Sequence, residues 1–315
     1  MSDKLKPLIT IIGPTASGKT ELGVKLAEKF GGEIVSGDSM QVYKEFEIST
    51  AKPTPCQMKK VKHHMVNILS VKEEFSTAKF KILASECINK ILEKNKLPFM
   101  VGGTGLYIDS VLKNTEYDFN ESNLKKSNID LTGLDNFELM EILKKIDIKS
   151  AEKIHVNDLK RLKRAIEFFY SAGYPISEQV ENSHKIPSPY KTCKIGLNFK
   201  NRDILYERIN NRVDNMFESG IIDEVKNISV MKIGKTAKSA IGYKELLDFI
   251  EGNCSIDCAK ENLKRATRRY AKRQLTWFRK DKEINWIYYD EYKEFSKIFE
   301  KSCDIVNKFL SEFKG

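Results

Sequence analysis

The chain has 315 residues, of which 41% are hydrophobic, so it is long enough to bury one large core together with an inserted subdomain. It lacks an N-terminal apolar segment and any run of about 18 apolar residues, which argues against a secretory signal and a membrane-spanning helix. The formal net charge of +10 permits a polyanionic partner, and six cysteines without a C-x-x-C pair predict reduced thiols in a cytoplasmic protein.

The first predicted elements are a buried strand and a helix that flank a glycine loop. The apolar run 8–12 predicts the strand, and the amphipathic stretch 21–30 predicts the helix. Between them, the pattern G-x-x-x-x-G-K-[ST] is matched by Gly13, Pro14, Thr15, Ala16, Ser17, Gly18, Lys19 and Thr20. In that context the loop N–H groups point at an anion, Lys19 adds a positive charge and Thr20 offers a hydroxyl to Mg²⁺. The pattern therefore predicts a polyphosphate site without identifying the polyphosphate.

Strands and helices then alternate up to a second glycine loop. Strands are predicted at 33–36, 65–69 and 97–101, and a helix is predicted at 76–94, where apolar residues recur with a helical period. The last of these strands leads into Gly102-Gly103-Thr104-Gly105. This rhythm predicts an α/β fold with a parallel sheet covered by helices, which binds its ligands at the carboxyl ends of the strands.

Two polar residues follow these strand ends and are candidates for chemistry. Asp38 could accept a proton or a hydrogen bond from a substrate, but it could equally form a turn or bind a metal. Thr104 could donate to a phosphate oxygen, and the glycines around it allow a ligand to approach the backbone, although glycine turns after strands are common. His63 and His64 have no further ligand at a useful spacing, so they are assigned no metal.

The character of the chain changes between residues 114 and 192. Helices are predicted at 135–146 and 157–172, the second capped by Asn157 and ended by Gly173, and the following segment up to Tyr190 is assigned no element. We therefore predict the first part of a P-loop core in 1–113, an inserted helical subdomain in 114–192, and completion of the core in 193–315. A basic cluster on an amphipathic helix of the insertion, a solvated face by default, contains Lys160, Arg161, Lys163 and Arg164.

The last third returns to the sheet and then becomes mostly helical. Strands are predicted at 194–197 and 285–289, and helices at 202–219, 222–230, 243–250, 256–279 and 292–313. The apolar run that ends in Asp290 fits a Walker B pattern but lies late, so we interpret it as a peripheral strand with a solvated acid. An ATP-hydrolysing motor is therefore poorly supported. Arg208 and Arg212, four residues apart, could reach a diphosphate or form surface ion pairs.

Most of the net positive charge is concentrated in residues 260–282. This stretch has ten basic and two acidic residues. Basic residues recur at helical spacing at Arg265, Arg268, Lys272 and Arg279. The opposing core stripe is predicted to contain Leu263, Ala266, Tyr270 and Trp277. We interpret the two aromatic residues as core and not as base-stacking platforms, and the unbalanced charge favours binding to nucleic acid phosphates.

Several motifs, taken together and in order, resemble the tRNA dimethylallyltransferases, also called tRNA isopentenyltransferases. The resemblance covers most of the chain. The motifs that carry it are Gly13–Thr20 (GPTASGKT), Asp38–Tyr43 (DSMQVY), Thr50–Pro53 (TAKP), His63–Leu69 (HHMVNIL), Phe75–Phe80 (FSTAKF), Val101–Ile108 (VGGTGLYI), Arg161–Phe169 (RLKRAIEFF), Ile241–Leu246 (IGYKEL) and Arg268–Arg279 (RRYAKRQLTWFR). The first is shared with many proteins, whereas the combination of DSMQVY, GGTGLY and KRQ-x-TW is far more specific.

The resemblance implies transfer of a dimethylallyl group from dimethylallyl diphosphate to N6 of an adenine, with release of diphosphate. That adenine lies on the 3′ side of the anticodon in tRNAs that read codons beginning with U. The implied fold is a P-loop, kinase-like sheet with a helical insertion. The implied cofactor is Mg²⁺ at Thr20, and the implied partner is the tRNA anticodon stem-loop. The enzyme is expected to be a cytoplasmic monomer.

The resemblance also implies roles for individual residues. Asp38 is expected to take the N6 proton, Thr104 to contact the leaving group or the Asp38 side of the site, and Arg208 and Arg212 to clamp the diphosphate. The residues expected to contact tRNA are Asp38, Ser39, Met40 and Gln41 at the adenine, Lys160, Arg161, Leu162, Lys163 and Arg164 in the insertion, and Arg269, Lys272, Arg273, Gln274, Thr276, Trp277 and Arg279 in the basic stretch. The chain departs from the family where Glu45 and Ser49 replace frequent glycines, Asn67 replaces a common Asp, and Lys160 stands where Gln is frequent.

Three other functions share part of these features. Prenyl transfer to free adenine nucleotides needs the glycine loop and Asp38 but has less need of the basic stretch. A kinase would consume ATP with an acceptor, and a non-catalytic RNA-binding module would work without Asp38.

Overall fold

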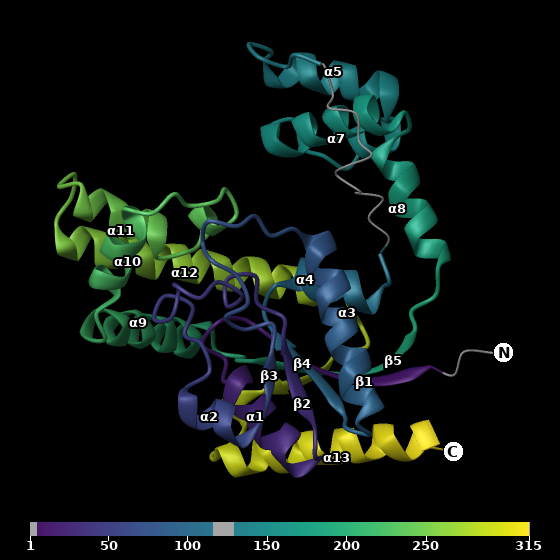
Figure 1. Cartoon of the computed structure of the whole chain (residues 1–315), viewed down its shortest axis with the longest axis vertical. Helices are drawn as coiled ribbons and strands as arrows, with labels where there is room; N and C mark the ends of the chain where they lie inside the picture. Colours follow the sequence, from purple (N-terminus) through teal and green to yellow (C-terminus); the bar gives the residue numbers. More distant parts are fainter. Residues whose placement is uncertain (1–4, 116–128, 315) are drawn as a thin grey trace. The chain divides into compact units, whose positions relative to one another are not determined.

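The computed structural model describes residues 5–115 and 129–314, and the chain forms two compact units. The larger unit contains residues 1–111 and 189–315, and the smaller unit contains residues 112–188. Figure 1 labels the elements of both. Within the described ranges, the structure contains no helix that is long and apolar enough to cross a membrane.

The larger unit is built on a sheet whose six strands are all parallel, in the order β3-β2-β4-β1-β5-β6. The strands are β1 (Lys6–Ile12), β2 (Glu33–Ser36), β3 (His63–His64), β4 (Pro98–Gly102), β5 (Tyr190–Asn198) and β6 (Asn285–Tyr288). The predicted parallel α/β fold is confirmed. Because β1 lies between β4 and β5, the glycine loop that follows it leaves the middle of the sheet.

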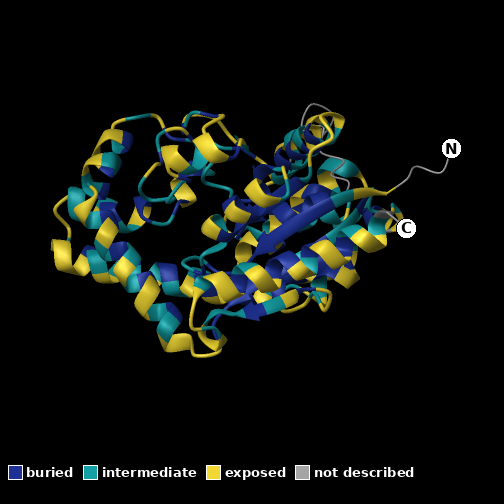
Figure 2. Cartoon of the chain, turned by 90° about the horizontal axis from the view of Figure 1, so that it is seen from below, coloured by how far each residue is buried: buried dark blue, intermediate teal, exposed yellow. Residues whose placement is uncertain are grey.

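Helices cover both faces of this sheet and extend beyond its carboxyl edge. In the larger unit they are α1 (Lys19–Lys29), α2 (Pro55–Lys60), α3 (Thr77–Glu93), α4 (Gly105–Leu112), α9 (Arg202–Glu218), α10 (Ile221–Ser229), α11 (Tyr243–Ile250), α12 (Ile256–Phe278) and α13 (Phe295–Lys314). On one face, α1 and α13 share a core with Ile9, Ile11 and Val101 of the strands. The buried residues that alternate with these, such as Leu8 and Met100, point to the opposite face. Figure 2 shows this burial along the strands.

The register of the strands brings three loops together at the carboxyl edge. Ile12 at the end of β1 pairs with Gly102 of β4 and with Gly196 of β5. Ser36 at the end of β2 pairs with Val101. The glycine loop, the Asp38 segment and the second glycine loop therefore start side by side, as expected for parallel strands.

The smaller unit is a helical cluster with its own core. Its helices are α5 (Asn136–Ile146), α6 (Ile148–Ala151), α7 (Leu159–Ala172) and α8 (Ile176–Lys185). Leu139, Leu143, Leu162 and Ile166 are fully buried between α5 and α7. Asp135 starts α5 with a capping box. Gly173 ends α7, as predicted, and does so in the left-handed conformation.

Three predictions of local structure need correction. The third strand is His63–His64 and not 65–69, because Met65 and Asn67 have positive φ angles that interrupt a strand. Asp158 caps α7 in place of Asn157. The segment after Gly173, which was assigned no element, contains α8. The predicted peripheral strand with a solvated acid is confirmed, because Asp290 is exposed and follows the edge strand β6; its carboxylate also accepts hydrogen bonds from the backbone N–H groups of Lys200 and Asn201.

Candidate active site

The glycine loop presents its backbone to a cavity at the carboxyl edge of the sheet. A Cβ on Gly13 would lie 2.3 Å from the carbonyl oxygen of Leu197 on β5, so only glycine fits there. Gly18, at the start of α1, has a φ of 84°, which favours glycine. The Ser17 hydroxyl and the Lys19 ammonium both donate to the carbonyl oxygen of Pro14. The loop is therefore held in shape by its own side chains before a ligand binds.

The cavity has a volume of about 500 Å³, and all of its lining residues belong to the larger unit. Its lining includes Lys19 and Thr20 of the glycine loop, Asp38 after β2, Gly103 after β4, Arg212 of α9 and Gln274 of α12. A volume of this size is typical of small-molecule sites and can hold a substrate with several polar groups.

Of the charged side chains that line this cavity, Lys19, Arg212 and Asp38 interact electrostatically. Burial, reinforced by the nearby Arg212 guanidinium, lowers the pKa of Lys19 to about 7, while the Asp38 carboxylate acts in the opposite direction. Burial also lowers the pKa of Arg212, and its Nε is enclosed without a hydrogen-bond partner among the described residues. Cations that are desolvated and incompletely paired are costly, so this site gains stability when a polyanion enters.

Asp38 forms a turn, which is one of the roles considered for it. Its Oδ1 accepts hydrogen bonds from the backbone N–H groups of Met40 at 2.9 Å and Gln41 at 3.4 Å, which forms a turn. Oδ2 takes no part in these bonds, so the carboxylate keeps an oxygen that can accept a proton. The structure contains no cluster of three His, Cys, Asp or Glu side chains that could hold a metal, in 5–115 or in 129–314. A metal held by protein acids alone is thus not built here.

Thr104 lies next to Asp38 but not on the cavity wall. Its Oγ1 accepts a hydrogen bond from the backbone N–H of Ser39 at 3.1 Å and donates to the Ser39 hydroxyl at 3.3 Å. Its own N–H donates to the carbonyl oxygen of Gly37. The Thr104 hydroxyl, expected to contact either the leaving group or the Asp38 side of the site, thus joins the loop after β4 to the loop after β2 on the Asp38 side.

The glycines of the second loop are required by packing within the protein. A Cβ on Gly102 would lie 2.3 Å from the Gly37 carbonyl oxygen, and one on Gly103 would lie 2.1 Å from Nε2 of Gln274. A Cβ on Gly105 would lie 2.3 Å from the Trp277 ring. These glycines are therefore required by close approach of the Asp38 segment and of α12, and Gly102 and Gly103 also line the cavity.

Residues from α12 form one wall of the site. Gln274 is 5% exposed and forms hydrogen bonds with the backbone of both glycine loops, at Thr15 and at Gly103. The Tyr270 phenol lies close to Thr104, Gln274 and Asp38, and burial raises its pKa to about 12, so it remains a hydrogen-bond donor at neutral pH. The interpretation of Tyr270 as core was thus incomplete, because its side chain also lines the cavity.

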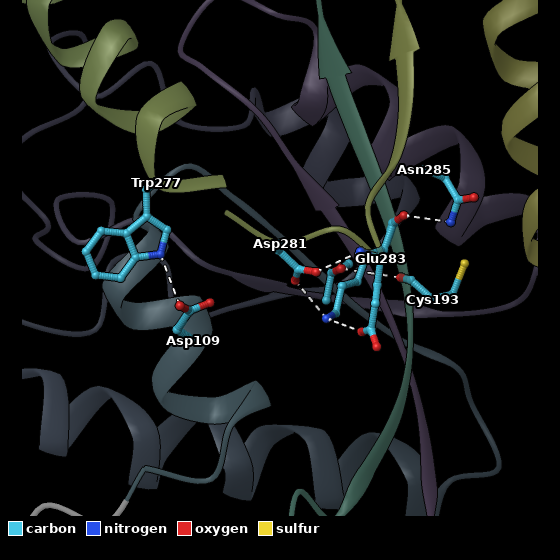
Figure 3. A network of polar contacts seen from close by, with 8 residues as sticks. Asp109, Cys193, Trp277, Asp281, Glu283 and Asn285 are labelled. Carbon is cyan, nitrogen blue, oxygen red and sulfur yellow. Dashed lines mark hydrogen bonds and ion pairs between the residues drawn. The ribbon is translucent and has the colours of Figure 1, made fainter. Parts of the chain in front are cut away.

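Trp277 anchors the end of α12. Its Nε1 donates to Asp109 Oδ2 of α4 at 3.1 Å, which Figure 3 shows. Figure 3 also draws Asp281 and Glu283, whose carboxylates both accept from the Lys194 ammonium of β5. The first contact fixes the end of α12 to α4, and the others fix the segment after α12 to the sheet. This supports the interpretation of Trp277 as a packing residue.

The two arginines of α9 have different surroundings. Arg208 Nε donates to the carbonyl oxygen of Ala16, and its guanidinium lies 5.5 Å from the Phe199 ring and 5.2 Å from the Tyr289 ring. Arg208 therefore supports the glycine loop from outside. Only Arg212 of the pair lines the cavity.

The basic residues of α12 divide into a paired and an exposed group. Lys260 and Lys264 both contact Asp214, and Arg268 contacts Glu261 and Asn210. The exposed group contains Arg269, Lys272 and Arg273, the last of which also lines the cavity; the uncharged Thr276 and Arg279, which directly follows the helix, are exposed as well. The buried stripe of the helix contains Leu263, Thr267, Ala271, Gln274, Leu275 and Phe278 and thus differs from the predicted one.

On α7 of the smaller unit, the candidate residues are also not equivalent. Lys160, Arg161 and Arg164 are exposed, and Lys163 is half-buried. Leu162 is fully buried in the core of that unit, so it supports the helix and cannot contact RNA.

One wall of the cavity was not assigned a role from the sequence. Residues 49–53 line it, and Glu224 of α10 holds the preceding backbone by accepting hydrogen bonds from the N–H groups of Glu47, Ile48 and Ser49 at 2.6 to 3.1 Å. The TAKP motif was the only signal in the sequence for this wall. Gln41, expected to read the adenine, here accepts from Ser36 and donates weakly to Thr50.

Comparisons with known proteins agree over most of the chain. Residues 41–281 match the family described as IPP transferase. A tRNA dimethylallyltransferase of Caldanaerobacter subterraneus is 43% identical over 305 residues, which cover 93% of this chain and 95% of that protein. A tRNA dimethylallyltransferase of Acetivibrio thermocellus is 45% identical over 296 residues, covering 92% and 94%.

Solved structures of similar proteins cover almost the whole chain. The full-length tRNA isopentenylpyrophosphate transferase from Bacillus halodurans has a TM-score of 0.74 and 39% identity, over 98% of each chain. A eukaryotic dimethylallyltransferase acting on tRNA has a TM-score of 0.83 and 30% identity, over 98% of this chain and 80% of its own.

Proposed function

Since this chain belongs to the IPP transferase family and transfers a dimethylallyl group to tRNA, we propose that the cavity at the carboxyl edge of its sheet is where that transfer occurs. The donor would be dimethylallyl diphosphate, and the acceptor would be N6 of the adenine 3′ to the anticodon. The observation that carries this proposal is the pair of enclosed cations, Lys19 and Arg212, beside the Asp38 carboxylate. The pair suits a diphosphate, and the acid suits a proton that must leave nitrogen.

The diphosphate would bind between the glycine loop and α9. Lys19 and Arg212 would each gain a counterion, and the start of α1 adds the partial positive charge of its N–H groups. Charge on the diphosphate grows as the allylic C–O bond breaks, so cations already in place stabilise the transition state more than the ground state. Arg208 would act indirectly, through its hydrogen bond to Ala16.

Mg²⁺ fits this site only in combination with the substrate. Thr20 lines the cavity and offers a hydroxyl oxygen. Mg²⁺ prefers oxygen ligands and commonly takes one or two from protein and the rest from phosphate and water. Bound at Thr20 with the diphosphate, it would neutralise charge on the leaving group.

Asp38 would be the base for the acceptor nitrogen. N6 attacks C1 of the dimethylallyl group, the C1–O bond electrons leave with diphosphate, and the N6 proton passes to the Asp38 carboxylate. The exocyclic amine of adenine is a weak nucleophile, so a positioned base lowers the barrier. The turn formed with Met40 and Gln41 holds the carboxylate in place.

The tRNA would be held by exposed cations on α12 and α7. On α12 and directly after it these are Arg269, Lys272, Arg273 and Arg279, and on α7 they are Lys160, Arg161 and Arg164. The adenine must leave the stacked anticodon loop to reach Asp38.

We also expect the enzyme to act as a monomer in the cytoplasm, which size-exclusion chromatography and cell fractionation can check.

A transfer assay tests the proposal. The purified chain is incubated with dimethylallyl diphosphate, Mg²⁺ and an unmodified anticodon stem-loop, and the digested RNA is analysed by mass spectrometry. We expect one dimethylallyl group on the adenine 3′ to the anticodon and none when that base is changed to guanine. Equal transfer to free AMP would favour prenylation of nucleotides, and consumption of ATP in place of the allylic donor would refute the proposal.

Arg212→Gln should raise the KM for the donor, with Arg208→Gln as the matched comparison.

A further inference from the structure

Gln274 is buried on a helix whose neighbouring positions carry exposed charge. Gln274 is 5% exposed, whereas the two residues that precede it, Lys272 and Arg273, are exposed. Its Oε1 accepts a hydrogen bond from the backbone N–H of Thr15 at 2.8 Å. Its Nε2 donates to the carbonyl oxygen of Gly103 at 2.9 Å. One amide group thus joins the loop after β1 to the loop after β4.

Both of these bonds constrain backbone. The N–H of Thr15 belongs to the glycine loop, and because it is directed at Gln274 it is not among the loop N–H groups that face an anion. The Gly103 carbonyl would be a buried acceptor without Gln274, and leaving such a group unsatisfied is costly. The Gln274 side chain also leaves no room for a side chain at residue 103, since a Cβ there would lie 2.1 Å from Nε2 of Gln274.

The neighbours of Gln274 on the same helical face lie against the loops after β2 and β4. Tyr270, one turn before, lies beside Asp38 and Thr104, and Trp277, one turn after, packs against Gly105. The inner face of α12 therefore lies against the loops after β1, β2 and β4, while its outer face carries the exposed cations.

We infer that Gln274 is a positioning residue that holds the diphosphate-binding loop in register with α12, and that it does not contact tRNA. This inference rests on the proposed function, because holding the loop after β1 in place matters for the reaction only if that loop binds diphosphate. It reassigns a residue that the family resemblance had grouped with the tRNA contacts. Its consequence is that donor affinity depends on the helix whose outer face is proposed to bind tRNA.

The inference is tested with Gln274→Ala and Gln274→Glu. Alanine removes both bonds, and glutamate keeps an acceptor for Thr15 but cannot donate to Gly103. We expect both variants to raise the KM for dimethylallyl diphosphate and the Kd for inorganic diphosphate about tenfold or more, with tRNA affinity unchanged within about twofold. Lys272→Ala, two residues away on the outer face, should weaken tRNA binding and leave the KM for dimethylallyl diphosphate and the Kd for inorganic diphosphate unchanged. Thermal melting identifies any variant that fails to fold.

A steric pair gives a second test that does not depend on the polar bonds. Gly103→Ala alone should weaken diphosphate binding, because its methyl group overlaps Nε2 of Gln274. In Gly103→Ala combined with Gln274→Ala that overlap is gone, and the next atom to be met is the Gly13 carbonyl oxygen at 3.4 Å. We therefore expect the double variant to bind diphosphate no worse than Gln274→Ala alone, which is a strongly non-additive result.

The outcomes separate the inference from the proposed function. Gln274 variants that lose tRNA binding in a salt-dependent way and keep normal diphosphate binding would overturn the inference and restore a tRNA contact. Additive losses in the Gly103 pair would also overturn it. If the unchanged chain binds inorganic diphosphate but transfers no dimethylallyl group, the proposed function fails, while the diphosphate measurements still decide the role of Gln274.

Discussion

The two glycine-rich loops at the carboxyl edge of the sheet are alike in sequence but meet the cavity in different ways. The loop after β1 turns its backbone and the Lys19 ammonium toward the cavity, and Gly18 is required there by its φ angle. The loop after β4 carries no charge, and Gly103 and Gly105 are required because side chains of α12 occupy the space above them. A glycine cluster after a strand thus indicates close approach, but only the neighbouring element decides whether a ligand or the protein approaches.

The largest expected effect concerns the carboxylate that lies near both loops. Asp38→Ala should lower kcat by about 10²–10⁴-fold, because it removes the positioned base without touching either loop. Binding of tRNA should remain, and single-turnover transfer with a filter-binding control measures both. Near-normal turnover would mean that the edge of the sheet serves only to hold the substrates.

The charge on the first loop gives a prediction about pH. Because burial lowers the pKa of Lys19 to about 7, the folded protein binds fewer protons than the unfolded chain between about pH 7 and the ordinary lysine pKa of 10.5. Stability from this group therefore rises with pH across that window, and the cost of holding the ammonium is largest at and below pH 7. Lys19→Met should stabilise the ligand-free protein most near pH 7 and progressively less toward pH 10, in urea titrations at several pH values.

The same residue should reverse its effect when the anion is present. Diphosphate favours the ammonium form, so affinity for inorganic diphosphate should fall as pH rises above 7 and be weakened by Lys19→Met about tenfold or more. Calorimetry in buffers of different ionisation enthalpy would detect proton uptake on binding near pH 8. Binding without proton uptake there would show that Lys19 is already charged in the empty loop.

Two alanine substitutions sharpen the contrast between the loops. Gly105→Ala should cost about 1–3 kcal/mol of stability by overlapping the Trp277 ring. Gly18→Ala meets no atom closer than 3.5 Å and should cost about 1–2 kcal/mol through its left-handed backbone alone. Trp277→Leu should suppress the first loss and leave the second unchanged, as followed by denaturant unfolding. Equal suppression of both would remove the distinction between the loops.

The smallest expected effect concerns the outer face of α12. Lys272→Ala should weaken tRNA binding a few-fold and reduce the slope of log K against log salt by about one. Lys264→Ala is the matched control, because its ammonium is already paired with Asp214 and should not be available to a phosphate. A similar loss in both variants would show that helix stability, and not phosphate contact, is being measured.

Local sequence patterns predicted much of the fold. The glycine loop, α3, α7 and α12 lie close to where periodicity and capping residues predict them. The errors occurred where short-range signals are weak: a two-residue strand at His63–His64 has no period, and α8 contains few apolar residues to mark one. In the site, Lys19 and Asp38 were identified from their positions after strands, whereas Arg208 and Arg212 could not be distinguished until α9 was placed.

By itself the sequence determined the parallel sheet, the position of the glycine loop after β1 and the family, because these depend on residues that are adjacent or regularly spaced along the chain. Tertiary structure alone decided that Gln274 bonds two loops, that Tyr270 lines the cavity and that Leu162 is core. Those roles depend on contacts between segments that are far apart in the sequence, and the direction in which a helix turns its side chains is known only when its neighbours are in place.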